Sequence, residues 1–157
     1  MGVCTIVYGV MQKTIAISAC LLGEKCRYDA RDNKNEMLLE QLQGHELIPF
    51  CPEDYAFGSP RPTMDLIHTS TGDKAISNET GEDISTPVLA YANTFFNKHP
   101  NIDMFIGKDR SPSCGVCSAR LYNEGKNLLS STEAGLMAKV ALNRNIVSID
   151  AEDFKGL

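Results

Sequence analysis

Short apolar runs alternate along the chain with longer polar or amphipathic segments, and this pattern defines the elements that the sequence predicts. Each run is bounded by polar, glycine or proline residues, which is typical of a buried strand. Four such strands are predicted, at TIAISA (14–19), HELIPF (45–50), IDMFIG (102–107) and IVSI (146–149). Pro49 suits the end of the second strand better than its middle, because proline cannot donate to a strand ladder.

Three segments place apolar residues at helical spacing, namely NEMLLEQLQ (35–43), TPVLAYANTFFNKH (86–99) and STEAGLMAKVALNRN (131–145). Asn33 or Asn35 can cap the first helix, and Gly44 can stop it. Pro87 suits the first turn of the second helix. The third opens on a serine and a threonine, which are suited to capping.

Two segments between these elements lack a clear period. Residues 51–65 hold three prolines and a glycine and predict an ordered loop. Residues 66–85 alternate weakly and predict a small hairpin or an irregular excursion. Strands that alternate with helices favour an α/β fold. We therefore expect a single compact three-layer domain over residues 14–157, with a mainly parallel, Rossmann-like sheet, preceded by an N-terminal extension at 1–13.

Composition and charge narrow the class of protein. The 157 residues are 43% hydrophobic and carry a net charge of −5, from 15 basic and 20 acidic side chains. That balance offers no broad basic surface for nucleic acid, and no apolar run approaches the roughly 18 residues that span a bilayer. The start lacks the basic flank and cleavage site of a signal peptide, and Ile6 breaks the myristoylation pattern. We expect a cytoplasmic monomer or homodimer that binds neither membrane nor bulk nucleic acid.

Three of the six cysteines lie just after predicted strands. Cys20 follows the first strand, Cys51 follows the second, and Cys114 lies in the loop after the third. Because the carboxyl ends of parallel strands share one edge of a sheet, these thiols are expected to converge there. Zinc with one open position would accept three cysteines, and so would an iron–sulfur cluster. The alternative is that each cysteine is a small buried apolar residue at a strand end.

The other cysteines leave further alternatives open. Cys114 and Cys117 form the Cys-x-x-Cys pattern of a redox dithiol, but residues 118–122 are expected to be extended, whereas such a motif should open a helix. Cys26 lies in the loop after the first strand, and Cys4 lies in the N-terminal extension. Disulfides are not expected, because the chain shows no export signal.

Five motifs recur in order along the chain: SACLLG, CRYD, CPE, PRP and SPSCG. As a set they resemble the uncharacterised-domain family that includes bacterial thiouracil desulfurase, over roughly residues 14–150. The resemblance implies a [4Fe–4S] cluster held by three cysteines, which map onto Cys20, Cys51 and Cys114. It also implies a desulfidase that removes sulfur from a small-molecule substrate, a thiolated pyrimidine base or nucleotide, without net redox change. The free iron would take the substrate's sulfur, and water would leave an oxygen in its place.

The resemblance further implies two catalytic residues near the cluster. They map onto Glu53 of CPE and onto Ser111 of SPSC, with Ser113 as the other candidate. A carboxylate beside a cluster and an apolar wall would have a raised pKa, which suits a group that acts as base and later as acid. Glu53 has the alternative of a solvated carboxylate or an ion-pair partner of Arg61. Either serine has the alternative of bonding its own loop backbone.

Four residues are predicted to bind substrate or to stiffen their loops by ion pairing: Arg27, Tyr28, Asp29 and Arg61. The guanidinium of Arg61 is suited to a carbonyl or a phosphate. Two other functions stay open. A thiol oxidoreductase would use Cys114 and Cys117. A sensor or binding protein would hold a structural cluster or zinc without catalysis, with Cys26 as the candidate for a fourth ligand.

Overall fold

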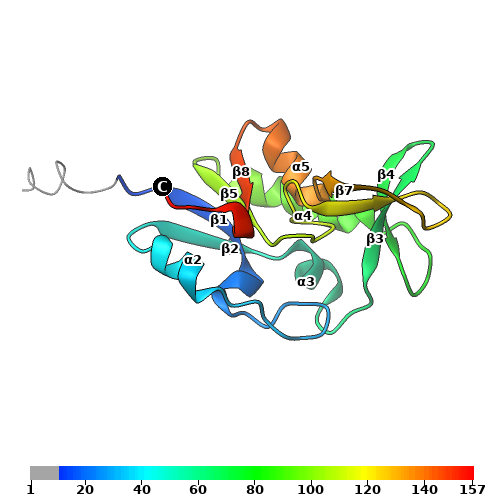
Figure 1. Ribbon diagram of the computed structural model, residues 1–157, viewed down its shortest axis with the longest axis horizontal. Coiled ribbons are helices and arrows are strands. Elements are labelled where there is room, and N and C mark those ends of the chain that lie inside the picture. Colours follow the sequence, from blue (N-terminus) through cyan, green and yellow to red (C-terminus); the bar gives the residue numbers. More distant parts are fainter. Residues whose placement is uncertain (1–10) are drawn as a thin grey trace, which may run out of the picture.

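The central sheet consists of four parallel strands in the order β2-β1-β5-β8 (Figure 1). The computed structural model describes residues 11–157, so most of the predicted extension at 1–13, with Cys4, lies outside the described residues. All four strands predicted from the apolar runs are present. Their bounds are Thr14–Ser18 for β1, Glu46–Phe50 for β2, Met104–Gly107 for β5 and Val147–Asp150 for β8.

Side chains alternate between the two faces of this sheet, so each face packs against a different layer of helices. Ile15 and Ile17 pack with Leu38 of α2 on one face. Ala16 packs on the other face with α4 and α5. These layers confirm the expected α/β fold. The helices are α2 Glu36–Gln41, α4 Ser85–Lys98 and α5 Leu136–Asn143. Within residues 11–157, no helix is long and apolar enough to cross a membrane.

A second sheet, in the order β4-β3-β6-β7, mixes parallel and antiparallel pairs (Figure 1). β3 and β4 form the hairpin that the weak alternation over residues 66–85 predicts. β6 falls in the segment expected to be extended, whereas β7 gave little sequence signal, because its Leu128 and Leu129 are exposed rather than buried. The bounds are Met64–Thr69 for β3, Gly72–Ser77 for β4, Ala119–Tyr122 for β6 and Leu128–Glu133 for β7.

The loop predicted over residues 51–65 begins with a short helix, α3 (Pro52–Phe57), so this prediction is wrong for its first half. Pro52 occupies the first turn, where its missing N–H costs no hydrogen bond. Glu53 and Asp54 place negative charge at the positive end of the helix dipole. The local sequence therefore supports one helical turn and a half before the remaining prolines stop it.

The third predicted helix starts later than expected. α5 begins at Leu136 rather than at Ser131, because residues 131–133 belong to β7 and pair with β6. Sheet pairing therefore outweighs the capping preference of a serine and a threonine. Two 3₁₀ helices directly follow β1 and β8, and these are η1 Ala19–Leu22 and η2 Ala151–Asp153.

Candidate active site

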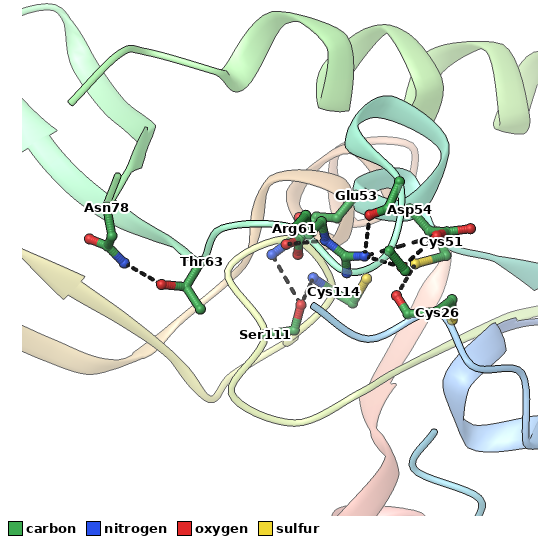
Figure 2. A network of polar contacts seen from close by, with 12 residues as sticks. Cys26, Cys51, Glu53, Asp54, Arg61, Thr63, Asn78, Ser111 and Cys114 are labelled. Atoms are coloured by element: carbon green, nitrogen blue, oxygen red, sulfur yellow. Dashed lines mark hydrogen bonds and ion pairs between the residues drawn. The ribbon is translucent and has the colours of Figure 1, made fainter. Parts of the chain in front are cut away.

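A cavity of about 610 Å³ opens at the carboxyl edge of the parallel sheet. Cys20, Cys51 and Cys114 all line it, so the structure brings together the three thiols that follow predicted strands. Cys26 joins them as a fourth. Figure 2 shows three of these cysteines close to Glu53 and Arg61. The mixed sheet supplies another wall of the cavity, with Met64, Asp65, Leu66, Arg120 and Tyr122.

Cys20 lies in η1 and is surrounded by groups that favour its thiolate. Its pKa falls to about 7, first because Cys26 donates a hydrogen bond and then because Asn33 does, with Lys108 and Arg27 adding positive charge. Asn33 Nδ2 lies 3.5 Å from Cys20 Sγ. The sequence suggests Asn33 only as a helix cap, and no local spacing links it to a cysteine. Asn35, the other candidate, caps α2 instead.

Cys51 connects β2 to α3 and is held through its backbone. Its N–H donates to the hydroxyl of Tyr91, on α4, at 3.2 Å. Its Sγ lies 3.6 Å from the carbonyl oxygen of Cys26. A hydrogen bond from Cys26 lowers the pKa of the Cys51 thiol, and the charge of Arg61 acts in the same direction. Tyr91 gave no signal in the sequence beyond its place on an apolar helix face.

Cys114 lies in a loop that packs directly on the end of β5. A Cβ at Gly107 would lie 1.8 Å from the Cys114 carbonyl oxygen, so only glycine permits this approach. Ser111 Oγ accepts from the N–H of Ser113 at 3.2 Å and from that of Cys114 at 3.0 Å, and so it shapes the turn. Burial and the neighbouring Cys51 raise the pKa of the Cys114 thiol well above its ordinary value.

Asp150, at the end of β8, ties down the far side of the same loop. It is 2% exposed and accepts from Val116 N, Cys117 N and Ser118 Oγ at 2.7, 2.9 and 2.8 Å. Cys117 is exposed, with its Sγ 3.7 Å from a carbonyl of β7, whereas Cys114 is buried in the cavity wall. The residues that follow form β6, as the extended prediction requires. No helix therefore opens at this Cys-x-x-Cys motif, and the geometry of a thioredoxin-like dithiol is lacking.

Glu53 lies in the first turn of α3 and faces the same cavity. Ser113 Oγ donates to Glu53 Oε2 at 2.9 Å, and Arg61 Nε lies 3.7 Å from Oε1. Burial raises the pKa of Glu53, and Arg61 and Ser113 oppose that rise. Glu53 is therefore a buried carboxyl held by two partners rather than a solvated loop carboxylate. Ser113 is fully buried, whereas Ser111 lines the cavity.

Arg61 is almost fully buried and is held by its own loop and by Glu53. Its side chain is 6% exposed, and Nη1 donates to the Gly58 carbonyl at 2.9 Å and to Ser59 Oγ at 2.6 Å. Among the described residues, Nε finds no hydrogen-bond acceptor. This nitrogen is itself buried, and its ion-pair partner is Glu53 Oε1, so it stabilises that carboxyl rather than facing the cavity.

The other predicted binding residues divide between the cavity and their own loop. Arg27 and Tyr28 line the cavity, with the guanidinium 5.5 Å from the centre of the tyrosine ring. Asp29 pairs with Arg27 at 3.5 Å and accepts from Arg31 N at 3.1 Å, so its contacts stiffen the loop. Two of the three predicted binding residues in CRYD therefore line the cavity.

The thiols suit some metal centres better than others. Within residues 11–157, no group of three or more His, Cys, Asp or Glu side chains is arranged to hold a metal ion. Zinc requires its ligands to meet at one atom. An iron–sulfur cluster binds each cysteine to a different iron, and its ligands can ring a cavity instead. Ligands must be thiolates, and Cys20 and Cys51 both have a lowered pKa.

The chain resembles known proteins over most of its length. The family described as 2-thiouracil desulfurase matches residues 15–153. Protein YbbK of Bacillus subtilis (strain 168), described as uncharacterized, is 29% identical over 155 residues, which cover 88% of this chain and 98% of that protein. The solved structure of a [4Fe-4S]-dependent thiouracil desulfidase, TudS, is 25% identical and superposes with a TM-score of 0.68, covering 91% of this chain and 93% of that one.

Proposed function

The chain belongs to the 2-thiouracil desulfurase family, and from this premise we propose that it is an iron–sulfur-dependent desulfidase of thiolated pyrimidines. The reaction exchanges a thiocarbonyl sulfur for a water oxygen and releases sulfide, so no electrons are gained or lost. One observation carries the proposal: three strand-end cysteines and a buried carboxyl, Glu53, face a single cavity.

In this proposal Cys20, Cys51 and Cys114 hold a [4Fe–4S] cluster. The cluster would supply a thiophilic Lewis acid, on an iron that has no protein ligand. The chain supplies the charges that such a centre requires. Arg27 and Lys108 stabilise the Cys20 thiolate, and the burial of Cys114, which disfavours a free thiolate, is compensated when a cation binds that sulfur.

Glu53 is the proposed general base. Its Oε2 accepts from Ser113 and its Oε1 faces Arg61 Nε, so the carboxyl is held in one orientation. Burial makes the protonated form easier to reach. Glu53 can therefore take a proton from the attacking water and later return it to the departing sulfur.

The two serines have different proposed roles. Ser113 is buried, and its hydroxyl donates a hydrogen bond to Glu53, so it positions the base. Ser111 lines the cavity and uses its oxygen to accept two backbone N–H groups. Its own proton is then free to bond the substrate or the attacking water. Arg61, which lines the cavity, is the proposed donor to a carbonyl of the pyrimidine.

The substrate is proposed to be a small molecule, either a thiolated nucleobase or a nucleotide. The cavity, at about 610 Å³, is of the size that small-molecule sites commonly have. Arg27 and Tyr28 are the proposed binding residues at its rim. The acidic net charge of −5 gives no support for binding a whole nucleic acid.

Cys26 favours a second candidate function. As a fourth thiol in the cavity wall it could complete the ligand set, which would leave no open iron and would make the protein a sensor or binding module. No comparable observation favours the thiol oxidoreductase, because Cys117 is exposed and separate from the buried Cys114.

Anaerobic quantification of iron and acid-labile sulfide, followed by addition of 2- or 4-thiouracil, tests the proposal. Near four irons and four sulfides per chain are expected, with sulfide released on addition of substrate. Iron without release of sulfide would favour the sensor. A chain that takes up no iron under reconstitution would refute both.

A further inference from the structure

The loop between η1 and α2, residues 23–35, lies against the cysteine sulfurs. Its course is fixed at Asn33, whose backbone N–H donates to the Cys20 carbonyl at 2.9 Å. Two of its side chains, Cys26 and Asn33, line the cavity, and neither takes part in the ligation or proton transfer proposed above. Both nevertheless contact sulfur.

Asn33 points its amide nitrogen at Cys20. Arg27 Nη1 donates to Asn33 Oδ1 at 3.0 Å, and a guanidinium can only donate, so Oδ1 must be the acceptor. This leaves Nδ2 facing Cys20 Sγ at 3.5 Å. Arg27 is itself held by Asp29 at 3.5 Å. The chain Asp29–Arg27–Asn33 thus orients one hydrogen-bond donor toward one sulfur.

Cys26 approaches two sulfurs at once. It is 6% exposed, and its thiol neighbours those of Cys20 and Cys51 in the cavity wall. Its carbonyl oxygen accepts from the Cys51 thiol, with Sγ at 3.6 Å. A fourth ligand would occupy its own corner of a cluster, whereas Cys26 lies between two of the proposed ligands. A thiolate bound to iron has no proton to give, so of these three sulfurs only that of Cys26 can donate.

We infer that Cys26 and Asn33 donate hydrogen bonds to the ligand sulfurs of Cys20 and Cys51, and that these bonds withdraw negative charge from the cluster. This inference rests on the proposed function, because it takes those two cysteines as ligands. Hydrogen bonds to cluster sulfurs shift the reduction potential, since they stabilise the state with more negative charge. Less charge on the sulfurs also leaves iron a stronger acceptor for the substrate's sulfur. Both residues act through the ligands and do not touch the substrate.

The full chain, reconstituted anaerobically, provides the test. Iron content and the cluster's midpoint potential are measured for Cys26→Ala, Asn33→Ala, the double variant and Cys26→Ser. Each single alanine variant should keep its iron and shift to a more negative potential, and the double variant should shift further. Cys26→Ser keeps an O–H donor and should stay closer to the unaltered chain.

Matched controls make the same chemical changes away from the sulfurs. Asn78→Ala removes an amide that lines the same cavity but bonds Thr63. Cys117→Ala removes an exposed thiol. Both should leave the potential unchanged, and circular dichroism confirms the fold of every variant.

The outcomes separate this inference from the proposed function. An unaltered chain that binds no cluster overturns both. If the chain binds a cluster but Cys26→Ala loses iron, Cys26 is a ligand and the inference fails. Unchanged potentials in the double variant with full iron also overturn it, and they leave the proposed function standing. If a single alanine variant fails to fold, Cys26→Ser and the remaining single variant still decide the outcome.

Discussion

Asp150 should be the residue whose loss disturbs the candidate site most while leaving its chemical groups in place. Its carboxylate accepts from the N–H groups of Val116 and Cys117 and from Ser118 Oγ, at 2.7, 2.9 and 2.8 Å. These bonds tie the end of β8 to the loop that carries Cys114. The perturbation is Asp150→Ala, which removes all three acceptor contacts at once.

The expected loss of stability follows from the hydrogen bonds that the donor groups lose. The N–H of Val116 is part-buried, and leaving such a group unpaired costs about 1–3 kcal/mol. The N–H of Cys117 makes a part-buried bond too, but the residue itself is exposed, so water can replace part of the bond and about 1 kcal/mol is lost there. The free energy of unfolding should therefore fall by about 3 kcal/mol. For a chain of this size the fall in Tm is roughly 6–12 °C.

Urea unfolding of the cluster-free chain, followed by circular dichroism, measures this cost. Asp150→Asn retains one acceptor oxygen and should lose less than Asp150→Ala. Asp153→Ala removes an exposed carboxylate three residues further on and should cost less than about 0.5 kcal/mol. A loss below about 1 kcal/mol for Asp150→Ala, or an equal loss for Asp153→Ala, would show that these bonds do not stabilise the loop.

Three other predictions concern the site and the fold. Gly107→Ala would place a Cβ against the Cys114 carbonyl oxygen, whereas the Cβ of Gly125→Ala would meet only flexible side-chain atoms. The iron content of Gly107→Ala after reconstitution should therefore be well below that of Gly125→Ala. Equal iron contents in the two variants would refute the packing argument. Glu53→Gln keeps the shape of the side chain and the acceptor for Ser113, but it cannot transfer a proton. The rate of sulfide release should therefore fall by roughly 10²–10⁴-fold at unchanged iron content. Full activity would exclude Glu53 as the base. Asp83 accepts two hydrogen bonds from the residue that begins α4, which lower its pKa. The ionised carboxylate of Asp83 therefore stabilises the fold above the ordinary Asp pKa of about 3.9. The difference in free energy of unfolding between the unaltered chain and Asp83→Ala should shrink as the pH falls through that region. A difference that stays constant from pH 7 to pH 3 would contradict this assignment.

The parallel sheet was predictable because its strands are buried on both faces. Ile15, Ala16 and Ile17 are each 0% exposed, so β1 appears in the sequence as an unbroken apolar run. Its end then marks the sheet edge where Cys20 lies. β7 is the opposite case, since Leu128 and Leu129 are exposed and its remaining residues are polar. Its place depends on pairing with β6, which the local pattern does not encode.

The contacts of the site were harder to anticipate than its cysteines. Asn33 reaches Cys20 only because the intervening loop folds back, and Tyr91 reaches Cys51 from a distant helix. The roles of the two serines were equally hard to predict, because the motif alone does not distinguish Ser111 from Ser113. Only the direction of their hydrogen bonds separates the one that shapes the turn from the one that holds Glu53.

The fold separates what holds the proposed ligands from what surrounds them. Cys20 and Cys51 follow β1 and β2, whose five-residue register fixes both positions. The donors to their sulfurs come instead from the loop at residues 23–35, which belongs to no sheet. A substitution in that loop can therefore alter the hydrogen bonds to sulfur while the ligand positions stay fixed. Substitutions in this loop should therefore vary the reactivity of the proposed centre while the three cysteines stay in place, because the loop lies outside β1, β2 and β5.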